Sequence, residues 1–295
     1  MIVFGSAITD PEVYERCAKP GIRVASEPDS AVLAYESTGS LFRNYNLVLD
    51  RAAEFDDLEA LALIHQDTEL VDSDFCEKVR EAMRDPDVAI VGCVGAIGVR
   101  GIAWWEGAVT WASFTHRYEE LGGGDFEGQA WRSDQTPSYA ETGEVDSIDG
   151  FVMVLSPWAV RELRFDESLG QIHGYDFDFC MQARAAGKKV MTADFRAIHH
   201  HSLDLISNRD AWVEAHIRLM EKWDGRLPNA RGASDDWKQR ALRAEAEAAA
   251  AKGDAESSRL KYEALGRQLG KLAQSKSWRL TAPLRSVRHW FERRP

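Results

Sequence analysis

The stretch LEALALIHQDTEL (residues 58–70) decides the fold class, because a continuous apolar run passes directly into polar and acidic side chains. An apolar run without alternation is typical of a strand that is buried on both faces, as in a parallel sheet covered by helices. Ligands bind beyond the carboxyl ends of such strands. The polar half of the stretch is therefore either a surface turn or a ligand site at the edge of a sheet.

Similar apolar runs alternate with helix patterns along the chain. Asp10 followed by Pro11 is a helix start, since aspartate caps the free amides and proline fits the first helical position. The pattern predicts strands at residues 2–8, 21–27, 58–64, 88–95, 145–156 and 188–198, and helices at residues 10–19, 40–54, 73–85, 157–164 and 175–187. This alternation predicts an α/β fold with a mostly parallel sheet flanked by helices.

The bulk properties narrow the function classes. The formal net charge of -12 argues against a general nucleic-acid binder, which needs a basic footprint. The four cysteines lack the spacing of a zinc site or of a disulfide scaffold. Residues 2–8 read as a strand without a basic leader, and the longest apolar stretch, residues 88–99, is too short to span a bilayer. We therefore expect a cytoplasmic protein without a transmembrane segment.

The composition changes near the carboxyl end. We predict a catalytic domain at residues 1–232, a helical extension rich in Ala, Glu, Lys and Arg at residues 233–273, and a basic, aromatic tail at residues 274–295. The last 30 residues carry about +7 and the rest of the chain about -19. Such a tail suits peripheral contact with anionic lipid on the inner face of the plasma membrane, or packing on the acidic domain.

Four clusters of polar side chains are candidates for a functional site. His65, Asp67 and Glu69 share a face if the extended conformation persists, and an acidic cluster there suits a hard divalent cation. Asp176 and Asp178 fall at the start of a helix, where capping alone explains carboxylates. The remaining candidates are the histidines at residues 199–201, which follow a strand as potential metal ligands, and the Asp149–Gly150 pair at a strand edge.

In this order, the clusters resemble the glycosyltransferase family 2 group with the GT-A fold, and more narrowly its bacterial branch for surface polysaccharides. The resemblance rests on RNYNLVLDRA (residues 43–52), ALIHQDTEL (residues 62–70), VDSIDGFVMVLSPWAV (residues 145–160) and AIHHHS (residues 197–202). Its most specific part is FDESLGQIHGYDFDFCMQARAAGKKV (residues 165–190). The likeness covers residues 2–207 and implies a GT-A-like catalytic domain.

The resemblance implies an inverting transfer of a sugar from a nucleotide-sugar donor to a hydroxyl of a glycan or lipid-linked acceptor. Asp67 matches the last aspartate of the DxD motif and would bind Mn²⁺ or Mg²⁺, with His199 as second ligand and His201 as its rival. Asp176 matches the aspartate of the ED motif and would be the general base. The nucleotide would contact Gly5, Ser6, Glu27, Asp29, Asn44, His65, Gln66 and Asp67. The donor sugar or acceptor would contact Asp149, Gly150, Tyr175, Asp178, Trp104 and Trp105, with Trp111 as a further stacking candidate.

The chain departs from the family pattern at two positions. The first carboxylate of DxD is replaced by His65, and the glutamate of ED by Tyr175. Two alternatives to the transferase therefore stay open. One is a catalytically silent GT-A module that acts as a binding or scaffold protein, and the other is a different metal-dependent nucleotide-sugar enzyme.

Overall fold

The computed structural model describes residues 1–36, 39–104, 109–112, 114–118, 125–127, 143–201 and 208–228, and near the carboxyl end residues 248, 255, 259–272, 274–275 and 278. The chain divides into two units, Met1–Ala233 and Ser234–Pro295. In the first unit the strands are β1 (Ile2–Ile8), β2 (Ala31–Glu36), β3 (Ala60–Ile64), β4 (Thr68–Leu70), β5 (Val88–Gly92), β6 (Val94–Ile97), β7 (Val109–Ala112), β8 (Phe114–Tyr118), β9 (Asp125–Glu127), β10 (Gly143–Val145), β11 (Ser147–Ile148), β12 (Val152–Leu155), β13 (Lys189–Thr192) and β14 (Ala197–His201). The helices are α1 (Pro11–Arg16), α2 (Ala18–Ala25), α3 (Leu41–Ala52), α4 (Phe75–Ala82), α5 (Pro157–Glu162), the short 3-10 turn η3 (Glu167–Leu169), α6 (Tyr175–Ala185) and α7 (Arg209–Trp223).

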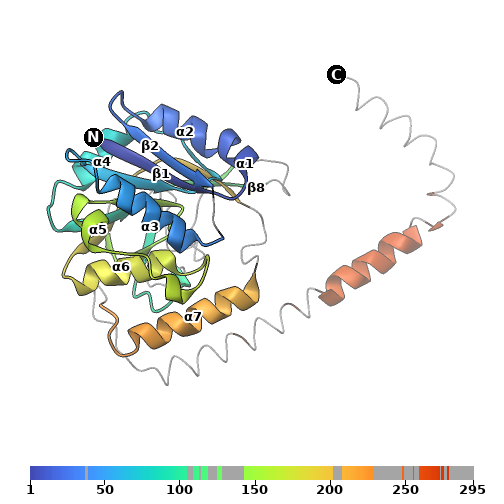
Figure 1. Cartoon of the computed structure of the whole chain (residues 1–295). Helices are drawn as coiled ribbons and strands as arrows, with labels where there is room; N and C mark the ends of the chain where they lie inside the picture. Colours follow the sequence, from blue (N-terminus) through green and yellow to red (C-terminus); the bar gives the residue numbers. More distant parts are fainter. Residues whose placement is uncertain are drawn as a thin grey trace. The chain divides into compact units, whose positions relative to one another are not determined.

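The main sheet has seven strands in the order β10-β13-β5-β12-β3-β1-β2. Its edge strand β2 and the neighbouring β1 are labelled in Figure 1. Strands β2, β1 and β3 are parallel to one another, as are β5 and β13, whereas β12 runs antiparallel to both β3 and β5. The carboxyl ends of β1, β2, β3 and β5 therefore meet at the edge where β12 begins. The predicted α/β fold with a mostly parallel sheet is confirmed.

Helices cover both faces of this sheet, as the continuous apolar runs predict. A Cβ atom on Gly5 of β1 would lie 2.6 Å from Val48 of α3, so α3 packs directly on that face. The ring of Phe4, the preceding residue, lies 5.8 Å from that of Phe75 on α4. Since neighbouring residues of a strand point to opposite faces, α3 and α4 cover opposite sides of the sheet.

Two smaller sheets extend the edge at which the site is built. One has the order β4-β14-β8-β9 and the other β11-β6-β7. Three stretches that were predicted as single strands, residues 88–95, 145–156 and 188–198, each divide between the main sheet and one of these smaller sheets. Single strands there were wrong predictions, because apolar content does not reveal where a strand changes sheets.

The predicted strand at residues 21–27 was also wrong. Residues 18–25 form helix α2, and the second strand is β2, which starts at Ala31. Pro20 lies in the first turn of the helix, where no amide hydrogen bond is lost. Gly21 faces β4, and a Cβ atom on it would lie 2.3 Å from the backbone nitrogen of Leu70. The Pro-Gly pair therefore marks a close helix–strand contact and not a break before a strand.

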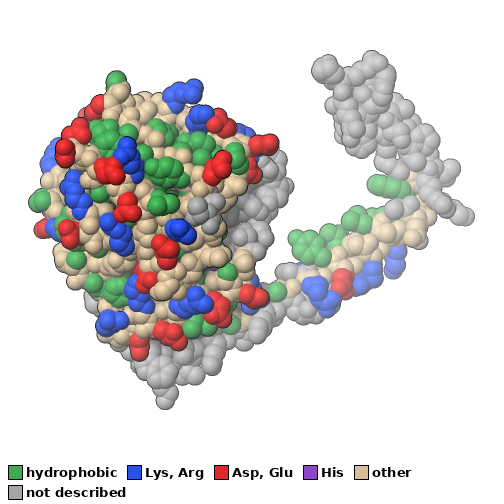
Figure 2. Space-filling model, viewed as in Figure 1, with side chains coloured by type: hydrophobic (Ala, Val, Ile, Leu, Met, Phe, Trp, Pro, Cys, Tyr) green, Lys and Arg blue, Asp and Glu red, His purple; other side chains and the backbone are tan. Residues whose placement is uncertain are grey.

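The second unit is described mainly by the helix at residues 259–272. Five large apolar side chains of this helix are exposed, namely Leu260, Tyr262, Leu265, Leu269 and Leu272. Figure 2 shows hydrophobic side chains along one side of this helix and Lys and Arg along the other, whereas both charge signs are interspersed on the visible face of the first unit. Among the described residues, no helix combines the length and apolarity needed to cross a bilayer.

Candidate active site

The end of β3 leads directly into the candidate site. After Ile64 the chain makes a tight turn, in which the Thr68 amide donates to the His65 carbonyl at 3.1 Å, and then enters β4 of the second sheet. Strand β14 pairs antiparallel with β4 and places His199 opposite Thr68. The His200 amide donates to the Asp67 carbonyl at 2.8 Å. This pairing brings two segments more than 130 residues apart to the same point.

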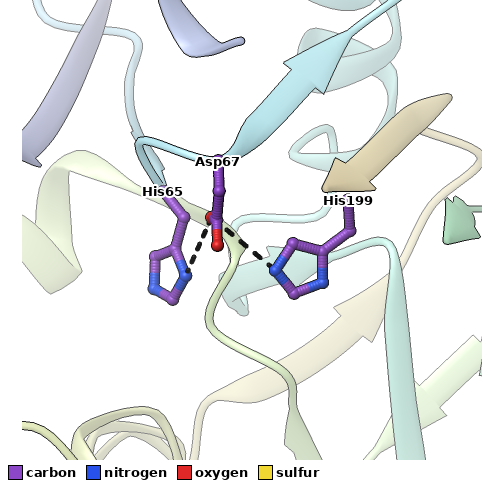
Figure 3. A group of neighbouring side chains, drawn as sticks. All are labelled: His65, Asp67 and His199. Atoms are coloured by element: carbon purple, nitrogen blue, oxygen red, sulfur yellow. Dashed lines mark ion pairs between the residues drawn. The ribbon is translucent and has the colours of Figure 1, made fainter. Parts of the chain in front are cut away.

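His65, Asp67 and His199 form a compact cluster at this turn (Figure 3). The Asp67 Oδ1 atom lies 3.9 Å from His65 Nδ1 and 3.7 Å from His199 Nε2. One ligand atom from each residue lies within 4.8 Å of the others. Oδ1 of Asp67 is buried and has no hydrogen-bond partner among the described residues. An orphaned carboxylate oxygen between two imidazole nitrogens fits a divalent cation with nitrogen and oxygen ligands.

Packing fixes the orientation of both imidazoles. The His199 ring stacks on Phe151, with centroids 4.4 Å apart and planes 12° from parallel. His65 Nε2 lies 2.5 Å from the hydroxyl oxygen of Tyr175, the first residue of α6. Burial raises the pKa of Tyr175 well above its usual value, so the hydroxyl keeps its proton. The contact with Phe151 and the link from His65 to α6 were not predicted.

Asp176 follows Tyr175 in the first turn of α6. Its Oδ2 accepts from the Gly150 amide at 3.0 Å and its Oδ1 from the Phe177 amide at 2.8 Å. Burial, together with the charge of Asp149, raises the pKa of Asp176 to about 7. A carboxylate with a pKa near neutrality is suited to accept a proton from a hydroxyl. Asp149 accepts from the indole nitrogen of Trp104 at 2.9 Å. Because Asp176 is bonded to Gly150, the residue after Asp149, both acidic residues lie beside the start of β12.

Glu69 and Asp178 point away from the cluster. The chain turns at residues 65–68, so Glu69 does not share a face with Asp67, and it faces His200 Nε2 at 3.0 Å. Asp178 is 1% exposed and accepts hydrogen bonds from Lys222, Gln182 and the indole of Trp223. Its carboxylate therefore anchors α7 to α6, and the structure does not bring it to the cluster of His65, Asp67 and His199.

Three of the predicted nucleotide contacts serve the fold around β1. Gly5 and Ser6 lie within β1, and the Ser6 hydroxyl donates to the Ile64 carbonyl at 2.8 Å. The Gln66 side chain accepts from the amides of Thr9 and Asp10, both at 2.8 Å. Gln66 therefore joins the ends of β1 and β3 and shapes the edge of the site.

Glu27 and Asp29 lie at the opposite edge of the sheet. They precede β2, because the predicted strand at residues 21–27 is a helix. Both carboxylate oxygens of Glu27 accept from Arg80, at 2.8 and 2.6 Å. Their predicted contact with the nucleotide assumed that a strand at residues 21–27 ends beside the site, and that assumption was wrong. The residue that ends β2 is Glu36, whose carbonyl accepts from the buried Asn44 side chain at 3.4 Å, so Asn44 does lie at the expected edge.

The structure describes the predicted tryptophans and His201 to different extents. Trp104 is 6% exposed and packed in the core. Trp105 lies outside the described residues. For Trp111 in β7 and His201 at the end of β14, only the strand positions are described. The choice between His199 and His201 is therefore carried by the geometry of His199 alone.

The family model described as "Glycosyltransferase like family" matches residues 3–223. The Streptomycin biosynthesis protein StrF of Streptomyces griseus is 28% identical over 205 residues, which cover 68% of this chain and 67% of that protein. The solved structure of GalNAc-T7 with UDP, GalNAc and Mn²⁺ aligns with a TM-score of 0.50 at 11% identity, over 76% of this chain and 48% of that chain. The structure of A197 from STIV aligns over 68% of this chain and 85% of that chain, with a TM-score of 0.43 at 13% identity.

Proposed function

The chain belongs to this glycosyltransferase-like family, and from that premise we propose that it is an inverting, metal-dependent glycosyltransferase. It moves a sugar from a nucleotide-sugar donor to a hydroxyl acceptor. The observation that carries the proposal is the orphaned oxygen of Asp67 between His65 and His199, at the carboxyl end of β3. Asp176 follows Tyr175, which contacts His65, and this position beside the cluster supports an acid–base role for Asp176.

His65, Asp67 and His199 would hold Mn²⁺ or Mg²⁺. The ion would neutralise the charge that develops on the departing nucleoside diphosphate. The nitrogen and oxygen donor set favours Mn²⁺ over Mg²⁺, since Mg²⁺ is bound mostly by oxygen. The structure of GalNAc-T7, which has the same type of fold, contains Mn²⁺ and UDP.

Asp176 would remove the proton from the acceptor hydroxyl. The resulting oxygen attacks the anomeric carbon, while the bond from that carbon to the phosphate oxygen breaks and the diphosphate leaves with the electron pair. One displacement inverts the anomeric configuration. The pKa of about 7 supports this role, because the carboxylate is ionised near neutral pH and still basic enough to accept the proton.

Two likenesses bear on the acceptor. The resemblance to surface-polysaccharide enzymes suggests a glycan or a lipid-linked sugar, whereas the relative StrF is named for streptomycin biosynthesis.

We propose peripheral contact with anionic lipid on the cytoplasmic side of the membrane, supported by the exposed leucines and basic residues of the helix at residues 259–272.

A thermal-unfolding panel tests the proposed function. UDP, dTDP, GDP and CMP are each added with Mn²⁺, Mg²⁺ or EDTA, and a ligand at a hundredfold excess over its Kd stabilises the fold by about 2.7 kcal/mol. One nucleotide should raise the Tm only when metal is present. Asp67→Asn should abolish that shift, whereas Asp56→Asn, an exposed aspartate before the other end of β3, should retain it.

Analysis of the reaction products distinguishes the transferase from the two alternative functions. With the identified donor, an acceptor-dependent product of inverted anomeric configuration supports the transferase, and sugar release without acceptor supports a hydrolase. Absence of nucleotide binding under all metal conditions would favour a silent GT-A module.

A further inference from the structure

The Tyr175 hydroxyl is held rigidly against the backbone of the strand edge. A Cβ atom on Gly150 would lie 2.2 Å from the Tyr175 hydroxyl oxygen, so only glycine admits the ring at this depth. The ring is 6% exposed and meets Tyr45 and Phe42 edge-on, at centroid distances of 5.6 and 6.2 Å. The hydroxyl oxygen therefore has a fixed position, 2.5 Å from His65 Nε2.

This contact involves one of the two His65 ring nitrogens and so bears on which of them is available to a cation. A neutral imidazole carries its proton on one nitrogen and a lone pair on the other. His65 Nδ1 faces Asp67, and its lone pair points into the cluster only when the proton is on Nε2. The Tyr175 hydroxyl can donate to an unprotonated Nε2 or accept from a protonated one, and only the second arrangement, common for outer partners of metal-binding histidines, leaves Nδ1 free for a cation.

We propose that Tyr175 is a positioning residue, which fixes the His65 tautomer and ring angle so that Nδ1 can bind the metal; this inference rests on the proposed function for the nature of the site. The two positions at which the chain departs from the family pattern are thus in direct contact. The tyrosine does not touch the substrate in this role and acts only through His65.

The tautomer of metal-free protein is the first test. Long-range proton–nitrogen NMR spectra distinguish protonated from unprotonated imidazole nitrogens, and His65 is assigned from the signals that disappear in His65→Gln. Wild type should carry the proton on Nε2. Tyr175→Phe, which keeps the ring, should show a mixture of tautomers. A matched control is Tyr45→Phe, because the buried Tyr45 hydroxyl has no hydrogen-bond partner among the described residues.

The affinity for Mn²⁺ alone, measured from the electron paramagnetic resonance of the free ion, is the second test. Loss of an outer partner typically weakens metal binding ten- to a hundredfold, so Tyr175→Phe should fall in about that range and Tyr45→Phe should bind as wild type does. In a His65→Ala background, Tyr175→Phe should change the affinity by less than about twofold, since the tyrosine acts through His65.

The two proposals fail in different ways. An unchanged tautomer in Tyr175→Phe, together with wild-type Mn²⁺ affinity, overturns the positioning role. An equal loss of affinity in Tyr45→Phe overturns it as well, because general packing would then explain the effect. If wild type binds no Mn²⁺ but the tautomer still depends on Tyr175, the positioning of His65 stands and the metal-dependent function falls.

Discussion

Replacing Asp176 with asparagine should abolish transfer and, above neutral pH, make the protein more stable. Burial raises the pKa of Asp176 from 3.8 to about 7, so the folded chain ionises this group less readily than the unfolded chain does. At about 1.4 kcal/mol per tenfold change, ionising it in the folded state costs up to about 4 kcal/mol more. Asparagine keeps the size of the side chain and carries no charge.

The sign of the pH dependence follows from proton binding. Between about pH 4 and pH 7 the folded wild type retains a proton that the unfolded chain has lost, so the wild-type free energy of unfolding falls as the pH rises through this window. Above about pH 7 the effect levels off. The asparagine amide cannot accept both backbone hydrogen bonds, which subtracts about 1 kcal/mol at every pH.

The expected advantage of Asp176→Asn is therefore near zero at about pH 4.5 and about 2–3 kcal/mol at pH 8. The advantage at pH 8 corresponds to a rise in Tm of about 4–12 °C for a domain of this size. Urea unfolding followed by tryptophan fluorescence at both pH values measures it. Asp178→Asn, the same change two residues along α6, is the control with opposite sign, because it breaks a buried pair with Lys222 and should cost about 3 kcal/mol.

An advantage that is equal at both pH values would refute the reasoning, since an effect of charge burial must follow the ionisation. Retained transfer in Asp176→Asn would refute the assignment of the base while leaving the stability argument intact. The two readouts are independent, because unfolding needs neither donor nor acceptor.

Three further substitutions should change the stability of the fold, and packing determines whether each one raises or lowers it. Gly150→Ala should destabilise the fold by about 1–3 kcal/mol and weaken Mn²⁺ binding, because its Cβ meets the Tyr175 hydroxyl at 2.2 Å; Gly266→Ala, with open space around it, is the control in both assays. Gly21→Ala should lower the Tm although alanine favours helices by about 1 kcal/mol, because its Cβ meets the backbone of β4; a raised Tm would contradict the close contact. Tyr45→Phe should leave the free energy of unfolding unchanged or raise it by about 1 kcal/mol in urea unfolding, because it removes a buried hydroxyl without a partner among the described residues; a loss above about 1 kcal/mol would contradict this.

The sequence predicts the parts of the fold that local patterns determine. The apolar run before His65 is a buried strand, the capped start at Asp10 begins a helix, and a helix also begins at Pro157, where one was predicted for residues 157–164. The pattern fails where a long-range contact decides. Gly21 looks like a helix breaker before a strand but is the point at which α2 contacts β4. Because residues 21–27 were predicted as a strand, Glu27 and Asp29 were predicted at the wrong edge of the sheet.

The same distinction applies to the candidate site. Asp67 and His199 were identified from motifs, but their proximity depends on the antiparallel pairing of β4 with β14, which residue types do not reveal. The turn after His65 likewise removes Glu69 from the cluster. Tyr175 was noted in the sequence as a departure from a family pattern and as a predicted sugar or acceptor contact, whereas its contact with His65 needed the packing of α6 against Gly150.

Asp176 and Asp178 show why residue type alone does not assign a role. Both are aspartates in the first turn of α6, where helix amides favour a carboxylate. Asp178 faces the Lys222 ammonium, 2.9 Å away, so its charge is neutralised and stabilises the contact with α7. Asp176 is buried beside Asp149, so its charge is costly even though two backbone amides donate to it, and its pKa rises to about 7. Because the two aspartates lie about half a helical turn apart, Asp178 holds α7 against α6 while Asp176 provides the carboxylate with the raised pKa.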